Sequence, residues 1–258
     1  MTKYQKALLE QSATCYVLRE DPQLADGIPA GRRDRAEDDC IARKLTVRRG
    51  RWSSQPRGPV GDGIGLLVLE GLLLRRIAVG GRFGAELLGP GDLVRPADTA
   101  YVEPMLRQAT AWQALEFAQL AVLDGSVTKS LARYPEVIER LVARTTERSR
   151  RLLVNMAIVH HPRVDVRLQM AFWHLADRWG RIDGGQVLLP LRLTHSVLAD
   201  LIAARRPSVS KALSDLARRG ILSRVEAGWL LASEPPRVLP ENADDCKTTD
   251  EPALGRRI

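Results

Sequence analysis

Cysteine and histidine are scarce in this sequence, and neither forms a metal-binding pattern. The three cysteines, Cys15, Cys40 and Cys246, are far apart and make no Cys-x-x-Cys pair, so the usual zinc spacings are excluded. No histidine precedes His160. We therefore predict no metal site. Unpaired, reduced cysteines are typical of cytoplasmic proteins, and we expect that location.

Long apolar runs are also missing. No stretch of 18 apolar residues occurs, so we expect no membrane span. Residues 1–10 lack an apolar run after their lysines, so we expect no signal peptide. Positive charge, by contrast, is in excess. The 258 residues carry a formal net charge of +8, which favours a polyanionic partner such as nucleic acid.

The segment Thr194–Gly220 has the pattern of two short helices with a tight joint. Thr194 is a good N-cap for the first helix, and Pro207 suits the first turn of the second. Val209, Leu213 and Leu216 give the second helix an inward stripe, and Gly220 is placed to end it. This pattern predicts a helix-turn-helix, whose second helix enters the DNA major groove.

Polar and basic side chains remain on the outer side of this segment. Arg206 and Lys211 can donate to guanine O6 and N7, whereas serine hydroxyls can reach phosphate oxygens or base edges. The predicted DNA-binding residues are Thr194, Arg205, Arg206, Ser208, Ser210, Lys211, Ser214 and Arg224. The alternative is a solvated helix hairpin that is basic only for solubility.

The segments on either side of these helices favour DNA binding. Residues 221–231 contain two β-prone runs around Ala227-Gly228, which predicts a hairpin with its turn there. A hairpin behind a recognition helix is a wing, and Arg224 lies where it would touch the phosphate backbone. Residues 186–190 form a short apolar strand that would pair with this wing. The whole unit is predicted to be a winged helix-turn-helix.

The middle of the chain predicts strands followed by helices. Residues 65–94 are apolar runs punctuated by glycines, and residues 112–124 alternate; both patterns indicate a β-sandwich or barrel. Residues 135–160 predict one long helix and residues 166–179 a second, and residues 3–18 are a further possible helix. The first long helix carries residues at coiled-coil spacing: Ile138, Val142, Thr145, Ser149, Leu152, Met156 and Val159. The stripe predicts a parallel dimer; the alternative is packing on the chain's own strands.

Several of these residues together resemble the Crp/Fnr family of transcription regulators. The match lies in Leu193-Thr194, the run Ala199–Ile202, Arg206 and Lys211, and in a Gly-x-Gly-Asp corner at residues 89–92. Many members have Glu where this chain has Pro207, so the usual half-site sequence is not implied. The order of domains typical of the family would cover roughly residues 45–235.

The resemblance implies an α+β fold: an antiparallel, jelly-roll-like β-roll, a long dimerisation helix and a winged helix-turn-helix. The expected divisions are an N-terminal segment (1–44), a β-roll sensor domain (45–134), the dimerisation helix (135–161), the DNA-binding domain (162–234) and a flexible tail (235–258). The expected function is that of a homodimeric, sequence-specific transcription regulator and not of an enzyme. Its expected partners are double-stranded DNA, a second copy of the chain, RNA polymerase and a small-molecule effector.

The effector site departs from the family pattern. Cyclic-nucleotide-binding members have a Gly-Glu-Leu segment followed by Arg-Ser-Ala, and this chain lacks the first and has only Arg107-Gln-Ala-Thr as an echo of the second. Glu103 and Arg107 are the candidate ribose and phosphate partners, and Thr145 and Ser149 are candidates on the long helix. Ordinary surface roles are the alternative for all four. Some relatives hold an iron–sulfur cluster with four cysteines, and this chain has three, so no cofactor is assigned.

Two other functional classes remain open at this point. A cupin-like enzyme would need several histidine or acidic ligands inside the barrel, which the absence of histidine before His160 disfavours. A scaffolding dimer without a DNA role is disfavoured by Arg206 and Lys211 on the outer side of the motif. The salt dependence of DNA binding separates a regulator from a scaffold.

Overall fold

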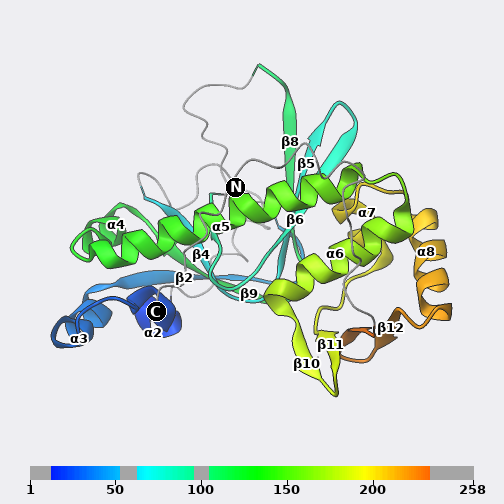
Figure 1. Ribbon diagram of the computed structural model, residues 1–258. Helices are drawn as coiled ribbons and strands as arrows, with labels where there is room; N and C mark the ends of the chain where they lie inside the picture. The colour runs from blue at the N-terminus through cyan, green and yellow to red at the C-terminus, as the bar shows by residue number, and fades with distance from the viewer. Residues whose placement is uncertain (1–12, 53–62, 96–104, 233–258) are drawn as a thin grey trace, which may run out of the picture.

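The computed structural model describes residues 13–52, 63–95 and 105–232. A β-roll occupies one end of the molecule, and a smaller unit of helices and a third sheet occupies the other (Figure 1). The long helix α5 (Pro135–His160) runs across both. This is the α+β architecture expected from the sequence.

Two antiparallel sheets make the roll. The first has the order β1 (Thr14–Tyr16), β2 (Ile41–Val47), β9 (Ala118–Leu123), β4 (Gly65–Glu70), β7 (Leu93–Val94). The second has the order β3 (Gly50–Trp52), β8 (Gln108–Ala114), β5 (Leu73–Val79), β6 (Arg82–Leu88). The strands predicted within residues 65–94 and 112–124 are thus confirmed, with β8 beginning earlier.

Apolar side chains fill the space between the two sheets. Trp52 and Trp112 meet edge to face with ring centroids 5.6 Å apart, and leucine, valine and alanine side chains from both sheets bury around them. The turn between β4 and β5 requires a glycine at Gly71. Its φ is +88°, and a Cβ there would lie 2.2 Å from the carbonyl oxygen of Phe117, so a side chain would clash with the turn between β8 and β9.

The N-terminal segment is part of the roll's packing. Strand β1 pairs with β2, and it is followed by α2 (Val17–Glu20), η1 (Pro22–Ala25) and α3 (Ala30–Asp39). The prediction of a helix over residues 3–18 is therefore wrong at residues 14–16, because these residues pair with β2 and form the edge strand of the sheet. Strand β2 also runs across the expected division at residue 45. Apolar residues of this segment bury against α4 (Gly125–Leu131) and the start of α5.

Helix α5 has the predicted bounds and two different faces. Val137, Leu141 and Ile158 are buried against the rest of the chain. Val142 and Met156 of the predicted stripe are exposed, at 59% and 56%. Leu152 and Val159 of that stripe are half-buried, whereas Leu153 is 65% exposed. The exposed apolar stripe therefore passes through Leu153, one residue beyond the predicted position.

The second unit packs directly on the roll. It contains α6 (Val164–Trp179), β10 (Arg181–Asp183), β11 (Gln186–Leu189), α7 (His195–Leu201), α8 (Arg206–Arg218), β12 (Leu222–Val225) and β13 (Gly228–Leu231). Its core is continuous with Leu72, Leu74, Ala85 and Leu87 of strands β5 and β6 and the turn before them. None of the helices in the described part of the chain is long and apolar enough to cross a membrane.

Candidate DNA-binding site

The joint between α7 and α8 is a hydrogen-bonded helix end. Thr194 caps α7 as predicted, its hydroxyl accepting from the Val197 amide at 3.3 Å. At the other end, the Ala204 amide donates to the Ala199 carbonyl at 2.9 Å. Ala203 between them has a φ of +51°, the left-handed conformation that ends many helices. This closure turns the chain sharply enough for α8 to cross α7.

Helix α8 is held by its inner face and by both ends. Its inner residues Val209, Leu213 and Leu216 are buried, as the sequence predicted, and Ala212 joins them. Pro207 lies in the first turn, where it removes no intrahelical hydrogen bond. Gly220 has a φ of +66° directly after the helix. The opposite face is thereby fixed toward solvent.

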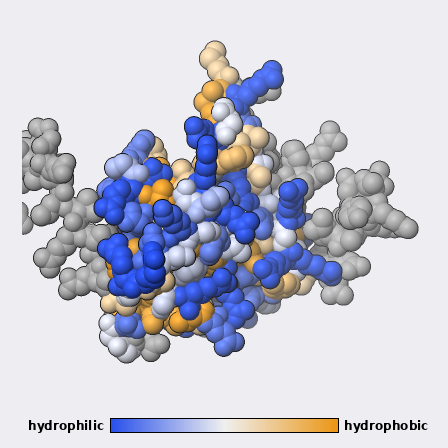
Figure 2. Space-filling model, turned by 90° about the vertical axis from the view of Figure 1, so that its right-hand side faces the viewer, coloured by the Kyte–Doolittle hydropathy of each residue, from blue (hydrophilic) through white to orange (hydrophobic). Residues whose placement is uncertain are grey.

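Three cations on that outer face have no partner among the residues that the structure describes. Arg205, Arg206 and Lys211 are exposed, and within the described part of the chain none of them has an ion pair or side-chain hydrogen bond. Arg218 at the far end of α8 is instead paired with Asp215. Uncompensated cations at the helix start, beside the free amides of its first turn, form a site for anionic oxygens. Figure 2 views the side of the molecule that carries α7 and α8, where hydrophilic side chains cover much of the surface.

The serines of α8 have unequal roles. Ser208 and Ser214 are exposed, although the Ser214 hydroxyl donates to the Ser210 carbonyl at 3.1 Å. Ser210 is half-buried, and its hydroxyl lies 2.8 Å from Nδ1 of His195. Sequence reasoning missed His195, whose position directly after the N-cap of α7 was the available signal. The contact connects the two helices, so the Ser210 hydroxyl is already engaged by His195 and is less available to DNA.

The wing follows α8 as predicted, with one change in its turn. Strands β12 and β13 pair antiparallel, with Val225 opposite Gly228. The turn is therefore Glu226-Ala227, one residue before the predicted Ala227-Gly228. Gly228 belongs to β13, and this strand position requires a glycine because a Cβ there would lie 2.1 Å from the Leu189 carbonyl oxygen. Strand β11 pairs with β13 as expected.

Arg224 lies on the wing with its guanidinium over an aromatic ring. It is exposed, and its Cζ is 5.8 Å from the centroid of Trp229. Trp229 in turn contacts Phe172 of α6, with centroids 5.0 Å apart. The buried aromatic pair thus fixes the base of the wing while the charge of Arg224 remains accessible.

Among the described effector candidates, no hydrogen bond or ion pair links Arg107 to Thr145 or Ser149. Glu103 lies outside the described residues. Arg107 is exposed at the start of β8, and Thr145 and Ser149 are exposed on α5. The two hydroxyls donate to carbonyls of their own helix, Thr145 to Leu141 at 2.8 Å and Ser149 to Thr145 at 3.1 Å.

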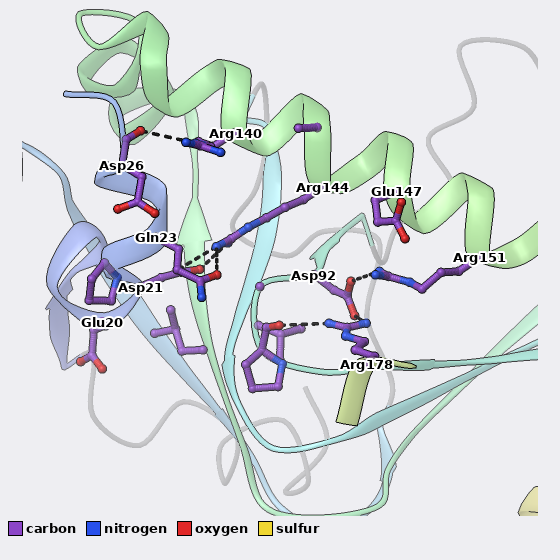
Figure 3. Close-up of a pocket in the computed structure, with 16 residues that line it drawn as sticks. Glu20, Asp21, Gln23, Asp26, Asp92, Arg140, Arg144, Glu147, Arg151 and Arg178 are labelled. Atoms are coloured by element: carbon purple, nitrogen blue, oxygen red, sulfur yellow. Dashed lines mark hydrogen bonds and ion pairs between the residues drawn. The ribbon is translucent and has the colours of Figure 1, made fainter. Parts of the chain in front are cut away.

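A cavity of about 710 Å³ lies elsewhere, on the inner side of α5 (Figure 3). Of the predicted effector residues that the structure describes, Arg107, Thr145 and Ser149, none lines it. Arginines from α5 and α6 approach it from one side, and acidic residues of the N-terminal segment from the other. Sequence reasoning missed this site because Asp21, Asp92 and Arg178 are distant in the chain.

Two buried carboxylates of the roll hold the helices above them. Asp92, 3% exposed, pairs with Arg178 at 2.7 Å and with Arg151 at 3.3 Å. Glu86, 9% exposed, pairs with Arg148 at 2.7 Å and also with Arg75. A buried carboxylate needs such partners because desolvation disfavours its charge. The Gly-x-Gly-Asp corner thus connects the roll to α5 and α6.

The described cysteines are buried thiols. Cys15 and Cys40 are 4% and 0% exposed, and Cys246 lies outside the described residues. Burial, together with the neighbouring Asp39 carboxylate, raises the pKa of the Cys40 thiol to about 11. Burial raises the pKa of Cys15 as well. Both groups are therefore thiols at neutral pH, which makes them poor nucleophiles and metal ligands.

The second unit of the chain matches a known domain. Residues 166–234 match the family model of the Crp-like helix-turn-helix domain. This range contains all but the first two residues of α6, both helices of the motif and the wing.

A longer match is found with a protein of Mycobacterium tuberculosis described as a CRP-like cAMP-activated global transcriptional regulator. The two sequences are 28% identical over 182 residues, which is 70% of this chain and 80% of that relative. The alignment is thus longer than the helix-turn-helix domain alone.

Solved structures with the same architecture include a CooA variant from Carboxydothermus hydrogenoformans, with a TM-score of 0.58 and 19% identity over 74% of this chain and 83% of that one. A cyclic nucleotide-binding domain containing protein from Listeria monocytogenes gives a TM-score of 0.56 and 14% identity, over 73% of this chain and 87% of that one. At these identities the likeness is one of fold.

Proposed function

We propose that this chain, as a member of the Crp/Fnr family of transcription regulators, is a homodimer that recognises a specific DNA sequence through α8. Arg206 and Lys211 read base edges in the major groove, and Arg205, Ser208 and Ser214 contact the backbone or flanking bases. Thr194 and Arg224 contact phosphates on either side. Ser210 is the exception, since its hydroxyl bonds to His195 and positions the helix.

The observation that carries this proposal is the set of cations at the start of α8 that have no ion-pair partner in the described ranges. Arg205, Arg206 and Lys211 stand on a helix whose other face is buried, so their charges are held in place without being neutralised. Pro207 replaces the Glu common in the family, which removes an acceptor for cytosine. We therefore propose an operator that differs from the usual family half-site.

Dimerisation is supported by the exposed stripe of α5. Val142, Leu153 and Met156 are each more than half exposed, with Thr146 and Ser149 between them at heptad spacing. The stripe lies on the side of the helix opposite Arg144 and Arg151, which face the protein. Parallel pairing of two such helices would place two copies of α8 about one helical turn of DNA apart.

We also propose that an effector bound to the chain changes the position of the DNA-binding domain, and that RNA polymerase is a further partner. The relative from Mycobacterium tuberculosis is described as cAMP-activated. This chain lacks the Gly-Glu-Leu segment, and the described interior of its roll is filled by Trp52, Trp112 and aliphatic side chains. We therefore propose an effector other than a cyclic nucleotide.

The DNA proposal is tested by selecting operator fragments from random DNA and measuring their affinity at several salt concentrations. A regulator that contacts several phosphates per half-site should lose roughly three orders of magnitude in affinity between 50 and 200 mM salt. It should retain a preference of at least about a thousandfold for the selected sequence. Binding without sequence preference, or without salt dependence, would contradict the proposal.

A further inference from the structure

The cavity under α5 is bounded by four parts of the chain. Residues 20–26 of the N-terminal segment form one wall, and residues 90–92 of the roll form the floor. Helix α5 forms the opposite wall, and Arg178 of α6 closes the inner end (Figure 3). Its volume of about 710 Å³ is within the range of small-molecule sites.

At the inner end, two guanidinium groups share one carboxylate. Arg178 donates to Asp92 Oδ2 at 2.7 Å and to the Pro90 carbonyl at 3.0 Å. Arg151 donates to the other oxygen of Asp92 at 3.3 Å, while the Gly89 amide also donates to Asp92 at 2.9 Å. The acceptor capacity of Asp92 is thus divided among three donors, and Arg151 has only a long bond to it.

The other carboxylates near this end are engaged elsewhere. Asp21 forms a bidentate pair with Arg144. Glu147 forms one with Arg150, at 2.7 and 2.9 Å. Glu86, on the far side of Arg151, is held by Arg148 at 2.7 and 3.0 Å.

Arg151 and Arg178 therefore depend on the same carboxylate. Burial, and then the nearby positive charge of Arg178, lower the pKa of Arg151, whereas Asp92 and Glu147 act in the opposite direction. A partly buried cation that shares its only acceptor among the described residues gains from an additional anionic acceptor. Guanidinium groups bind carboxylates and phosphates particularly well because their paired donors match those oxygens.

We propose that the inner end of this cavity binds the anionic group of a small organic effector, a carboxylate or a phosphate monoester, through Arg151 and Arg178. The rest of the molecule lies toward the outer end, beside Arg140 and Asp26. There Arg140 makes a single hydrogen bond among the described residues, of 3.4 Å, to the Asp26 carbonyl. This inference rests on the proposed function, since it assigns a site and a chemical class to the effector.

The site lies where an effector can act on the DNA-binding domain. Arg151 belongs to α5, whereas Arg178 belongs to α6, within the Crp-like domain. An anion that binds both arginines fixes the angle between α5 and α6. It also competes with Asp92 of the roll for the guanidinium of Arg178. Because coupling between two sites is reciprocal, operator DNA should change the affinity for the anion by the same factor as the anion changes the affinity for DNA.

The test is a calorimetric titration of the full-length protein with three probes at constant ionic strength. Inorganic phosphate, glycerol 3-phosphate and citrate distinguish a phosphate from a carboxylate preference, and sodium chloride is the reference anion. At least one probe should bind with a stoichiometry of one per chain. Arg151→Gln should weaken that binding roughly ten- to hundredfold, because hydrogen bonds to a charged group are lost.

The control variant is Arg82→Gln, which removes the same charge from an exposed position at the start of β6. It should bind the probe as the wild type does. If Arg151→Gln does not fold, as judged by circular dichroism, Arg151→Lys replaces it; Lys keeps the charge but loses the paired donors, and binding should again weaken about tenfold. The inference is overturned if no probe binds more tightly than chloride, or if the folded Arg151 variant binds as well as wild type.

DNA binding is measured separately, without any probe. A wild-type protein that binds its operator but none of the three probes overturns this inference and leaves the proposed DNA function intact. A protein that binds a probe through Arg151 but no DNA has the opposite meaning, since it contradicts the proposed function.

Discussion

Arg76 of the roll and Asp200 of the helix-turn-helix form an ion pair with a distance of 2.6 Å between Nε and Oδ2. Arg76 also donates to Gln113 at 2.9 Å, so strand β8 holds its guanidinium in place. Both partners are about a quarter exposed. The first helix of the DNA-binding motif is thus attached to the roll by a contact separate from the Asp92–Arg178 pair.

We expect the substitution Asp200→Asn to weaken this attachment. A partly exposed pair contributes about 0.5–1 kcal/mol, so a double-mutant cycle with Arg76→Gln should give a coupling energy of that size. Amide exchange in α7 should become faster than in wild type. Asp215→Asn, which removes an ion pair within α8, is the matched control and should leave exchange in α7 unchanged. A coupling energy of zero would mean that the pair does not hold the two units together.

Replacing Arg206 by Ala should weaken binding to the selected operator by about 1–3 kcal/mol and relax the base preference at one position of each half-site. The reason is the loss of paired donors to guanine. Affinities for a panel of single-base operator variants measure both effects. Arg163→Ala, which removes an exposed cation paired with Asp165, should leave base preference unchanged. An Arg206→Ala protein with full discrimination would remove Arg206 from the site.

Replacing Leu153 by Glu should dissociate the proposed dimer. The change places like charges opposite each other in the stripe of two parallel helices, where desolvated charges are costly. We expect at least a tenfold weaker dimer, measured by analytical ultracentrifugation. Ile182→Glu makes the same exchange at a residue that is 87% exposed on β10 and should not affect assembly. Equal behaviour of both variants would assign the dimer contact to another surface.

Replacing Ala203 by Gly should stabilise the protein. Ala in the left-handed region costs about 1–2 kcal/mol, whereas Gly loses roughly 0.5–1 kcal/mol more backbone entropy on folding. The expected gain in the free energy of unfolding is about 0.5–1 kcal/mol, measured by urea denaturation. Ala217→Gly, in the right-handed last turn of α8, should destabilise instead. A loss at both positions would show that the turn tolerates Ala203 without strain.

The free energy of unfolding should decrease as the pH falls from 7.5 to 5.5, in part because His174 takes up a proton. Burial lowers the pKa of His174 below its usual value of 6.5 in the folded protein, although the nearby Asp177 carboxylate acts in the opposite direction. The unfolded chain therefore takes up the proton more readily. The stabilisation is fully present above the unfolded pKa and is lost as the pH falls through the folded pKa. For His174→Gln, the free energy of unfolding, measured by urea denaturation, should decrease less between these two pH values. An identical decrease would assign the effect to other groups.

The helices of the DNA-binding unit could be predicted because their signals are local. Thr194 caps one helix, Pro207 begins the next and Gly220 ends it, and each acts on backbone groups within one turn. The long helix was predicted with its bounds for the same reason, from Pro135 to His160. The strand at residues 14–16 could not be, because only pairing with β2 makes that segment extended.

The position of the stripe on α5 shows a similar limit. Leu152 and Leu153 are the same residue type at adjacent positions, so the sequence alone does not show which of them belongs to the exposed stripe. Packing on the roll buries part of Leu152 and leaves Leu153 exposed.

By itself, the sequence determined the recognition motif, the wing and the order of roll, long helix and DNA-binding unit, because capping residues, glycine turns and apolar periodicity act over a few residues. The tertiary structure alone decided that Asp92 faces Arg151 and Arg178, that Asp200 meets Arg76, and that Ser210 shares its hydroxyl with His195. These partners are 15 to 124 residues apart. Their charges and hydroxyls carry no pattern along the chain, and only the packing of helices on the roll brings them together.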